Sequence, residues 1–158
     1  MIRPANLSDL PRLLEIYAAA RAYMRQTGNP TQWGSRYPAE ETLRADIAAG
    51  QLYAVEKETG GLCGCFLLAP GPDPTYAVID GSWGLDKPYG VLHRVASDGS
   101  EGGILRRCVA FAAERYDYLR IDTHKDNLPM QRALAREGFM YRGIIITHDG
   151  TPRLAYDR

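Results

Sequence analysis

Residues 89–123 combine an apolar segment, a loop rich in glycine and serine, a helical pattern and a second apolar segment. The loop SDGSEGG joins YGVLHRVAS to a helix expected over 104–116, and YLRIDT at 118–123 completes the unit. A strand, a helix and a strand in this order form a right-handed crossover, which makes the two strands parallel neighbours in one sheet. The chain is therefore expected to fold around a parallel pair of strands.

The other segments predict helices and antiparallel strands around this pair. Apolar residues at helical spacing predict a helix over 8–26 with Ser8 as its N-cap, and Pro38 and Gly50 bound a second helix. The sequence predicts one mixed α/β (α+β) domain over residues 1–158, with a central twisted mixed sheet of about six to seven strands and about four helices. The remaining expected elements are strands over 51–57, 62–69 and 75–80, a short helix over 128–137 and a C-terminal hairpin around Asp149-Gly150.

The composition argues against several classes of protein. Lys plus Arg and Asp plus Glu number 19 each, so the formal net charge is zero and neither nucleic acid nor an anionic membrane is an expected partner. No segment reaches the about 20 apolar residues of a membrane span, and the opening MIRPANLSDL has no apolar signal-peptide core. A cytoplasmic protein is expected.

The three cysteines are Cys63, Cys65 and Cys108, an odd and small number that argues against a disulfide framework. Cys63 and Cys65 are two residues apart in an expected strand, so both should point to the same face of the sheet. No cluster of His or Cys lies near them in the sequence. Free buried thiols are therefore expected, and no metal site.

The glycine-rich loop before the helix at 104 favours an anion-binding site. Residues without side chains let backbone N–H groups approach an anion, and a helix N-terminus adds partial positive charge. The loop is not a P-loop, because no Gly-Lys-Ser/Thr follows, and its glycines do not have the dinucleotide-binding spacing. The alternative is a flexible turn that binds no ligand.

Four segments carry a family resemblance: IRPA and the helix after it, LHRVAS, the loop to Gly103, and RIDTHKDNLPMQRALAREGF. Their order resembles the GNAT superfamily of N-acetyltransferases, which use acetyl-CoA. The resemblance covers nearly the whole chain, and Asn127 and the Gly138-Phe139 pair have the family's spacing. Within the superfamily, the chain is similar to small uncharacterised bacterial members.

The resemblance implies that the strand ending at Ser97 pairs with the pantetheine arm and that the loop to Gly103 holds the pyrophosphate. The loop departs from the family pattern, because Ser100 replaces a basic or amide residue and Leu105 replaces a small one. Glu101 adds a negative charge that Arg106 and Arg107 could offset. The residues expected to contact acetyl-CoA are Val95, Ala96, Ser97, Ser100, Glu101, Gly102, Gly103, Ile104, Leu105 and Asn127.

Direct attack of an amine on the thioester needs a base, an oxyanion donor and a way to stabilise the leaving thiolate. His93 is the candidate base, since an unperturbed imidazole has a pKa of about 6.5; the alternative is a partly buried histidine with a structural hydrogen bond. The family's general-acid Tyr corresponds to Leu134, which cannot donate. Tyr141 and His124 are candidate replacements, and departure of the thiolate without a dedicated acid is the third alternative.

Asn127 is expected to cap the last helix, with Asp126 as its rival for that role, and also to contact the cofactor. Trp33, Tyr37 and Trp83 lie in loops that the resemblance places around the acceptor pocket, and simple loop packing is the alternative. No cluster of acidic residues marks a polyamine site in the sequence.

The expected function is acetyl transfer from acetyl-CoA to a primary amine of a small molecule or a peptide N-terminus. The alternative is a catalytically inactive GNAT-fold module with an acyl-CoA-binding or regulatory role. The C-terminal strands could pair two subunits in a homodimer.

Overall fold

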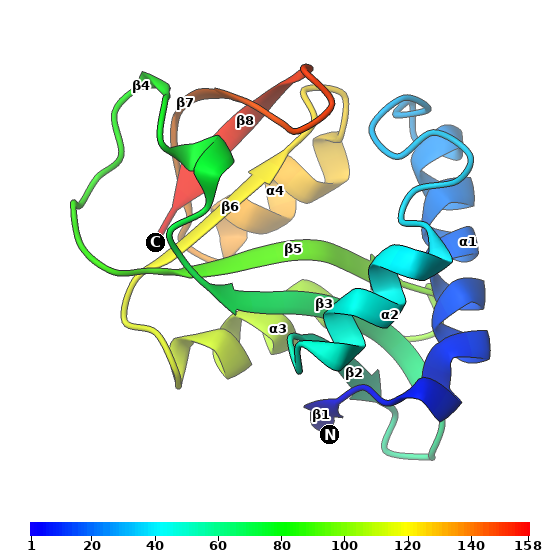
Figure 1. The fold of residues 1–158 in the computed structure, drawn as a ribbon. Helices are drawn as coiled ribbons and strands as arrows, with labels where there is room; N and C mark the ends of the chain where they lie inside the picture. Colours follow the sequence, from blue (N-terminus) through cyan, green and yellow to red (C-terminus); the bar gives the residue numbers. More distant parts are fainter.

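The computed structural model describes residues 1–158, and its eight strands form one sheet (Figure 1). Their order across the sheet is β1-β2-β3-β5-β6-β8-β7-β4, and only β5 and β6 run parallel to each other. The strands are β1 (Ile2–Pro4), β2 (Leu52–Glu56), β3 (Leu62–Pro70), β4 (Asp80–Gly81), β5 (Gly90–Ser97), β6 (Leu119–Thr123), β7 (Met140–Ile146) and β8 (Pro152–Asp157). The helices are α1 (Leu10–Gln26), α2 (Glu40–Ala48), α3 (Ile104–Ala113) and α4 (Leu128–Arg136), with 3-10 turns η1 (Leu7–Asp9) and η2 (Pro74–Tyr76).

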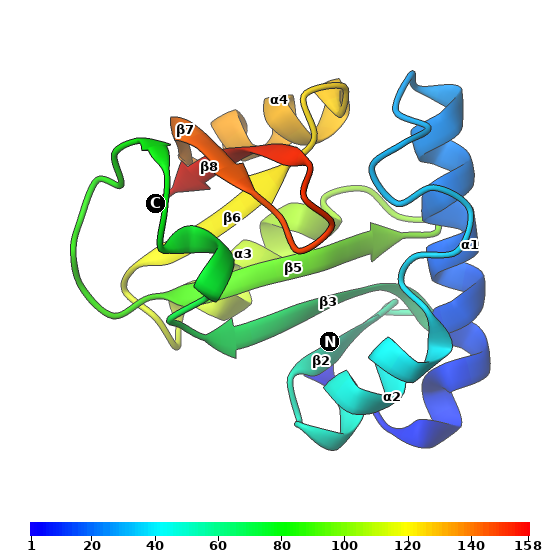
Figure 2. The same cartoon turned by 45° about the horizontal axis from the view of Figure 1, so that its top comes forward.

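Helices cover both faces of the sheet (Figure 2). Helices α3 and α4 share a buried apolar cluster with Leu92 of β5 and Phe66 of β3. Helices α1 and α2 form a second cluster with Cys65 of β3 and Ala96 of β5 on the opposite face. None of the helices is long and apolar enough to cross a membrane.

The expected parallel pair is present, but it is short. Strands β5 and β6 pair only at Gly90↔Leu119 and Val91↔Arg120, and they diverge beyond this point (Figure 1). Strand β6 continues in register with β8, whereas β5 stays paired with β3. The divergence leaves facing edges of β5 and β6 without strand partners, and unpaired strand edges offer backbone donors and acceptors to other molecules.

A β-bulge at Arg94 bends β5 where the two strands separate. Cys65 of β3 faces Ala96 and Leu67 faces His93, so β5 has one more residue than β3 in this interval. Arg94 has a φ of 51°, which is uncommon for a residue with a side chain. Because of the extra residue, the adjacent side chains of His93 and Arg94 both reach partners on the face covered by α1 and α2, instead of pointing to opposite faces.

A second bulge corrects the expectation for the cysteines. The β2–β3 register shifts between Val55 and Glu56, opposite Gly64 and Leu62. The extra residue in β3 turns Cys63 toward the α3 and α4 face and Cys65 toward the α1 and α2 face. The prediction that both thiols share a face was therefore wrong, although all three cysteines are free and buried.

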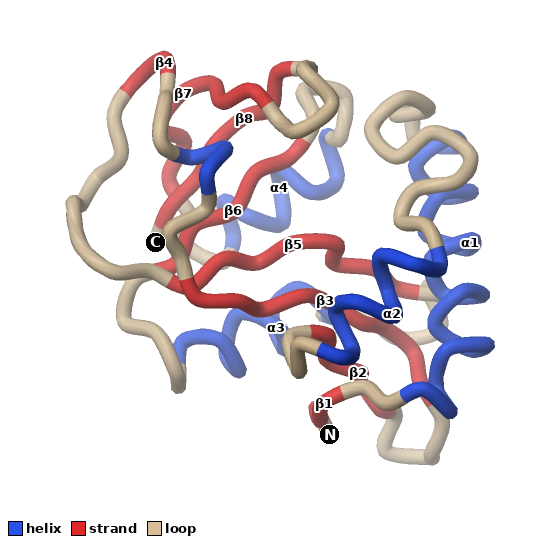
Figure 3. Tube along the Cα trace, viewed as in Figure 1, coloured by secondary structure: helices blue, strands red, loops and turns tan.

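The prediction of a strand over 75–80 was also wrong. The segment starts with η2, in which Asp73 accepts a hydrogen bond from the Thr75 N–H and Tyr76 is buried. Figure 3 shows that the connection from β3 to β5 is mostly loop, with this one helical turn and the two-residue strand β4. Together with the short β1, strand β4 raises the strand count above the expected six to seven.

Near the N-terminus, Asn6 rather than the expected Ser8 caps the first helical turn.

Candidate active site

The opening between β5 and β6 leads into two adjacent hollows. The inner cavity has a volume of about 640 Å³, and His93, Asp73 and Asp122 are part of its wall. The outer groove has a volume of about 930 Å³ and runs past Ser97 and Gly103 and along α4. The residues that line both hollows are Met24, Val95, Asn127 and Met130. The two hollows therefore meet where α4 begins.

The outer groove borders backbone amides that have no partner. Gly103 precedes α3 with a φ of 73°, and the N–H groups of Glu101, Gly102 and Gly103 donate no hydrogen bond within the protein. The first turn of any helix leaves further amides free. A Cβ added to Gly103 would meet no atom within 4 Å, so the loop faces open space. This arrangement suits an anion, as the loop sequence predicts.

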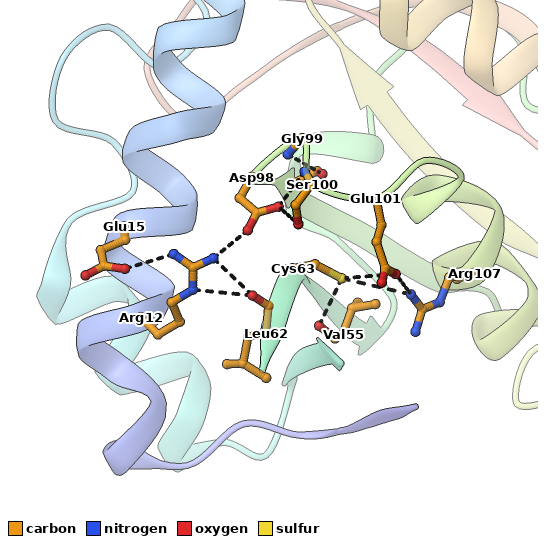
Figure 4. A network of polar contacts seen from close by, with 11 residues as sticks. Arg12, Glu15, Val55, Leu62, Cys63, Asp98, Gly99, Ser100, Glu101 and Arg107 are labelled. Carbon is orange, nitrogen blue, oxygen red and sulfur yellow. Dashed lines mark hydrogen bonds and ion pairs between the residues drawn. The ribbon is translucent and has the colours of Figure 1, made fainter. Parts of the chain in front are cut away.

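Ion pairs hold the loop and neutralise its carboxylates (Figure 4). Asp98 pairs with Arg12 of α1 and accepts a hydrogen bond of 2.8 Å from the Ser100 N–H. Arg107 Nη1 donates to Glu101 Oε2 over 3.1 Å. Arg107 therefore offsets the negative charge of Glu101, and the residues present fit a bound diphosphate.

His93 lies between two carboxylates. Its Nε2–H donates to Asp73 Oδ2 over 2.8 Å, and its Nδ1 is 3.7 Å from Asp122 Oδ2. Burial opposes ionisation of Asp73, but hydrogen bonds from His93 and Thr75 prevail and lower the pKa of its carboxyl to about 2. An ionised carboxylate can only accept, so Asp73 holds a proton on Nε2, and Nδ1 faces Asp122.

Tyr76 holds the side chain of Asp122 in place, although Tyr76 itself does not line the cavity. The Tyr76 hydroxyl donates to Asp122 Oδ2 over 2.7 Å, and burial, together with the charge of Asp122, raises the pKa of Tyr76. The ring of Tyr76 also lies 5.8 Å from the ring of His93. Asp73, Asp122 and Tyr76 thus fix the position of the His93 ring.

Aromatic residues from the α1–α2 connection form another wall of the inner cavity. Trp33 packs between Tyr17 and Tyr37, and Tyr37 packs against His148 from the β7–β8 turn. Arg153 of β8 donates to the Gln32 carbonyl over 3.3 Å. Trp33 and Tyr37, both expected near the acceptor, therefore line the cavity.

Asn127 contributes to both hollows. Its Oδ1 accepts from the Met130 N–H and caps α4, whereas Asp126 does not. Its Nδ2 donates to Gln32 Oε1 over 2.9 Å, and only 7% of the residue is exposed. The capping role is observed, and the position of Asn127 where the hollows meet suits the additional contact with a cofactor.

The other expected cofactor residues divide between groove wall and loop support. Ser100 and Gly102 do not line the groove, and the Ser100 hydroxyl donates to Asp98. Ser97 lines the groove and accepts a hydrogen bond from the Gly99 N–H. The expected residues in the groove wall are Val95, Ala96, Ser97, Glu101, Gly103, Ile104, Leu105 and Asn127.

Three of the expected site residues lie outside both hollows. Tyr141 is 54% exposed on β7 and packs edge-on against Tyr156. Trp83 donates to the Tyr76 carbonyl and stacks on Arg120, which is loop packing. His124 accepts from the Asp126 N–H through Nδ1, and its Nε2 is 3.4 Å from Thr31 Oγ1. Burial and the nearby Arg153 lower the pKa of His124.

The structure also brings together residues that the sequence pattern did not single out. Asp73, Asp122 and Asp149 come from three distant segments and line the same cavity. Asp122 carried a signal, because it is a charged residue within an apolar strand. Arg94 carried the same signal within β5, although its role also depends on a bulge, whereas Asp73 carried none because its role depends on a loop conformation.

Comparisons with known proteins agree with this geometry. A family model described as an acetyltransferase (GNAT) domain matches residues 1–140. An acetyltransferase of the GNAT family from Streptococcus agalactiae 2603 superimposes with a TM-score of 0.88 at 28% identity, covering 100% of this chain and 94% of that one.

Two further structures share the fold at lower identity. An acetyltransferase of the GNAT family from Listeria monocytogenes 4b F2365 has a TM-score of 0.72 at 19% identity, with 100% of this chain and 93% of that one covered. A ribosomal-protein-alanine N-acetyltransferase from Brucella melitensis has a TM-score of 0.64 at 21% identity, with 100% and 98% covered. A search of curated protein sequences found no significant relative. From the family match across most of its length and the fold that it shares with these enzymes, the chain belongs to the GNAT acetyltransferase family.

Proposed function

We propose that this protein transfers an acetyl group from acetyl-CoA to the primary amine of a small molecule. The observation that carries the proposal is the junction of the two hollows at Val95, two residues after His93 on the part of β5 that has separated from β6. A long groove with free amides at one end and a cavity with a histidine at the other suit an anionic donor and an amine acceptor. Membership of the GNAT family supports the donor.

The outer groove is the proposed site of acetyl-CoA. Free amides from Glu101 to Gly103, with those in the first turn of α3, would hold the diphosphate, and Arg106 in the groove wall adds positive charge. The unpaired edge of β5 at Val95 and Ala96 would hydrogen-bond the amides of the pantetheine arm. Bound in this way, the co-substrate would place its thioester where the hollows meet.

The inner cavity is the proposed acceptor site. Its carboxylates would attract the substrate as an ammonium ion, and Asp122 would orient the nitrogen toward Nδ1 of His93. The ammonium ion first releases one proton to solvent to become the nucleophilic amine, and His93 accepts the second proton, which the nitrogen loses as the new C–N bond forms. A backbone N–H of the divergent part of β5 would stabilise the negative charge that develops on the carbonyl oxygen. The volume of about 640 Å³ suits a small molecule better than a folded protein.

The test is release of CoA thiol from acetyl-CoA in the presence of a panel of amines. The panel contains monoamines, diamines, amino acids and short peptides, and mass spectrometry identifies the acetylated product. We expect turnover with at least one small amine, and His93→Ala to lower kcat/KM by about 100-fold or more. Tyr141→Phe is the matched control, because Tyr141 lies outside both hollows.

The results distinguish the alternatives. Binding of CoA without turnover on any amine would support an inactive acyl-CoA-binding module instead. Turnover only with peptides would assign the acceptor to a peptide N-terminus. A His93→Ala variant as active as the unmodified protein would refute the role of His93.

A further inference from the structure

Thr123, the last residue of β6, has a buried hydroxyl without a partner. The residue is 0% exposed, yet its Oγ1 makes no hydrogen bond. Buried polar groups in native proteins are almost always hydrogen-bonded, because leaving one unpaired is unfavourable. Thr123 also lines the inner cavity. The hydrogen-bonding capacity of this hydroxyl is therefore unused within the protein.

The hydroxyl and the histidine lie on opposite faces of the sheet. Successive strand residues alternate between faces, so Thr123 shares a face with Ile121 and not with Asp122. Ile121 belongs to the core beneath α3 and α4, which includes Leu134, whereas Asp122 contacts His93 on the other face. Thr123 and His93 therefore approach the opening between β5 and β6 from its two sides.

A donor to the departing sulfur would come from the side of Thr123. The family's acid corresponds to Leu134, which is fully buried and carries no donor. Among the other cavity residues near α4, Met130 cannot donate, and one of the two N–H groups of the Asn127 amide already donates to Gln32. The Thr123 hydroxyl is a donor on this face of the cavity with no partner in the protein.

We propose, building on the acetyl-transfer function, that Thr123 Oγ1–H donates a hydrogen bond to the thioester sulfur as the C–S bond breaks. The amine nitrogen forms a bond to the carbonyl carbon and gives its proton to His93, and the electron pair of the C–S bond goes to sulfur. Thr123 keeps its own proton, because an aliphatic hydroxyl is a much weaker acid than a thiol. The thiolate later takes a proton from solvent.

The test compares CoA with desulfo-CoA, which lacks the sulfur, by calorimetry above the thiol pKa of about 8.5. A hydrogen bond to a charged sulfur should make the unmodified protein bind CoA about tenfold more tightly than desulfo-CoA. This preference should vanish in Thr123→Val and persist in Thr123→Ser. Thr123→Val should fold with unchanged or higher thermal stability, since it removes an unpaired polar group.

The outcomes separate the role of Thr123 from the acetyl-transfer proposal. Equal preference for CoA over desulfo-CoA in the unmodified protein and in Thr123→Val would overturn the role of Thr123 while leaving the acetyl-transfer proposal intact. Failure of the unmodified protein to bind either compound would overturn both proposals. A destabilised Thr123→Val variant with an unchanged preference would show that the hydroxyl is structural. With the amine substrate, kcat should fall in Thr123→Val and recover in Thr123→Ser.

Discussion

Arg94 Nη2 lies 2.6 Å from Asp46 Oδ2, and this ion pair ties helix α2 to the bulge in β5. The same guanidinium donates to the Tyr37 hydroxyl over 3.1 Å, and the Tyr17 hydroxyl donates to the Arg94 carbonyl over 2.8 Å. Three elements on one face of the sheet therefore hold the residue at which the central strands separate. These contacts hold the bulge of β5 in place beside the site.

Removal of the Arg94 side chain should destabilise the protein. Arg94→Ala leaves Asp46 half-buried without its partner, which should lower the free energy of unfolding by about 2–4 kcal/mol. Arg94→Gly also loses the ion pair but relieves the positive φ, so it should be more stable than Arg94→Ala by about 1 kcal/mol. Urea unfolding measures both variants. An Ala variant as stable as the Gly variant would contradict the left-handed conformation.

Asp73 should make stability depend on pH in the acid range. Its pKa of about 2 in the folded protein is below the ordinary value of about 3.9 in an unfolded chain. Its ionised form therefore contributes stability that is fully present above pH about 4 and is lost as the pH falls toward 2. Asp73→Asn should be less stable than the unmodified protein above pH 4, and the difference should shrink on acidification. Thermal unfolding across this pH range measures the difference, and the exposed Asp86→Asn is the control. A difference in stability between Asp73→Asn and the unmodified protein that stayed constant with pH would contradict the account.

Arg107 should protect cofactor binding from the charge of Glu101. Arg107→Ala frees a carboxylate at the groove wall, so the affinity for CoA should fall by about two- to fivefold at low salt. The double variant Glu101→Gln/Arg107→Ala should recover most of the loss, because no unpaired charge remains. Calorimetry with CoA measures all three proteins. Equal losses in the single and double variants would show that Glu101 does not influence the ligand.

Much of the fold could be predicted because its signals are local. The glycine loop between two apolar strands predicted the parallel pair β5 and β6, and Asp149-Gly150 predicted the last hairpin. The segment 75–80 misled because its β-branched and aromatic residues favour a strand, whereas Pro74 and the side chain of Asp73 favour a helical turn there. Bulges at Cys63 and Arg94 reversed the faces of the residues after them, and period-two patterns cannot detect an inserted residue.

The site was predicted in part for the same reason. His93 was detectable as a polar residue in an apolar strand, and Gly103 as part of a loop of recognisable composition. The partners of His93 were not, since Asp73 is twenty residues away in a loop and only the folded chain brings it within 2.8 Å. Thr123 resembled an ordinary strand residue, and only its unpaired hydroxyl distinguishes it.

The two readings of Asn127 can be separated by two variants. Asn127→Asp keeps an oxygen that can cap α4 but loses the donor to Gln32 and adds a negative charge beside the groove. It should therefore stay close to the original stability and bind CoA more weakly. Asn127→Ala should lose about 1 kcal/mol of stability because the cap is removed. Undiminished CoA affinity in Asn127→Asp would restrict Asn127 to its role as a cap.

Calorimetric titration of acetyl-CoA into the unmodified protein, Gly103→Ala and Gly103→Glu tests the central claim most directly. Both variants share the strain of a side chain at a φ of 73°, so each should lose about 1 kcal/mol of stability. Only Gly103→Glu places a negative charge against the diphosphate, and it should bind acetyl-CoA at least about tenfold more weakly than Gly103→Ala. Equal affinities of the two variants, or no binding by the unmodified protein, would contradict the proposed site of acetyl-CoA.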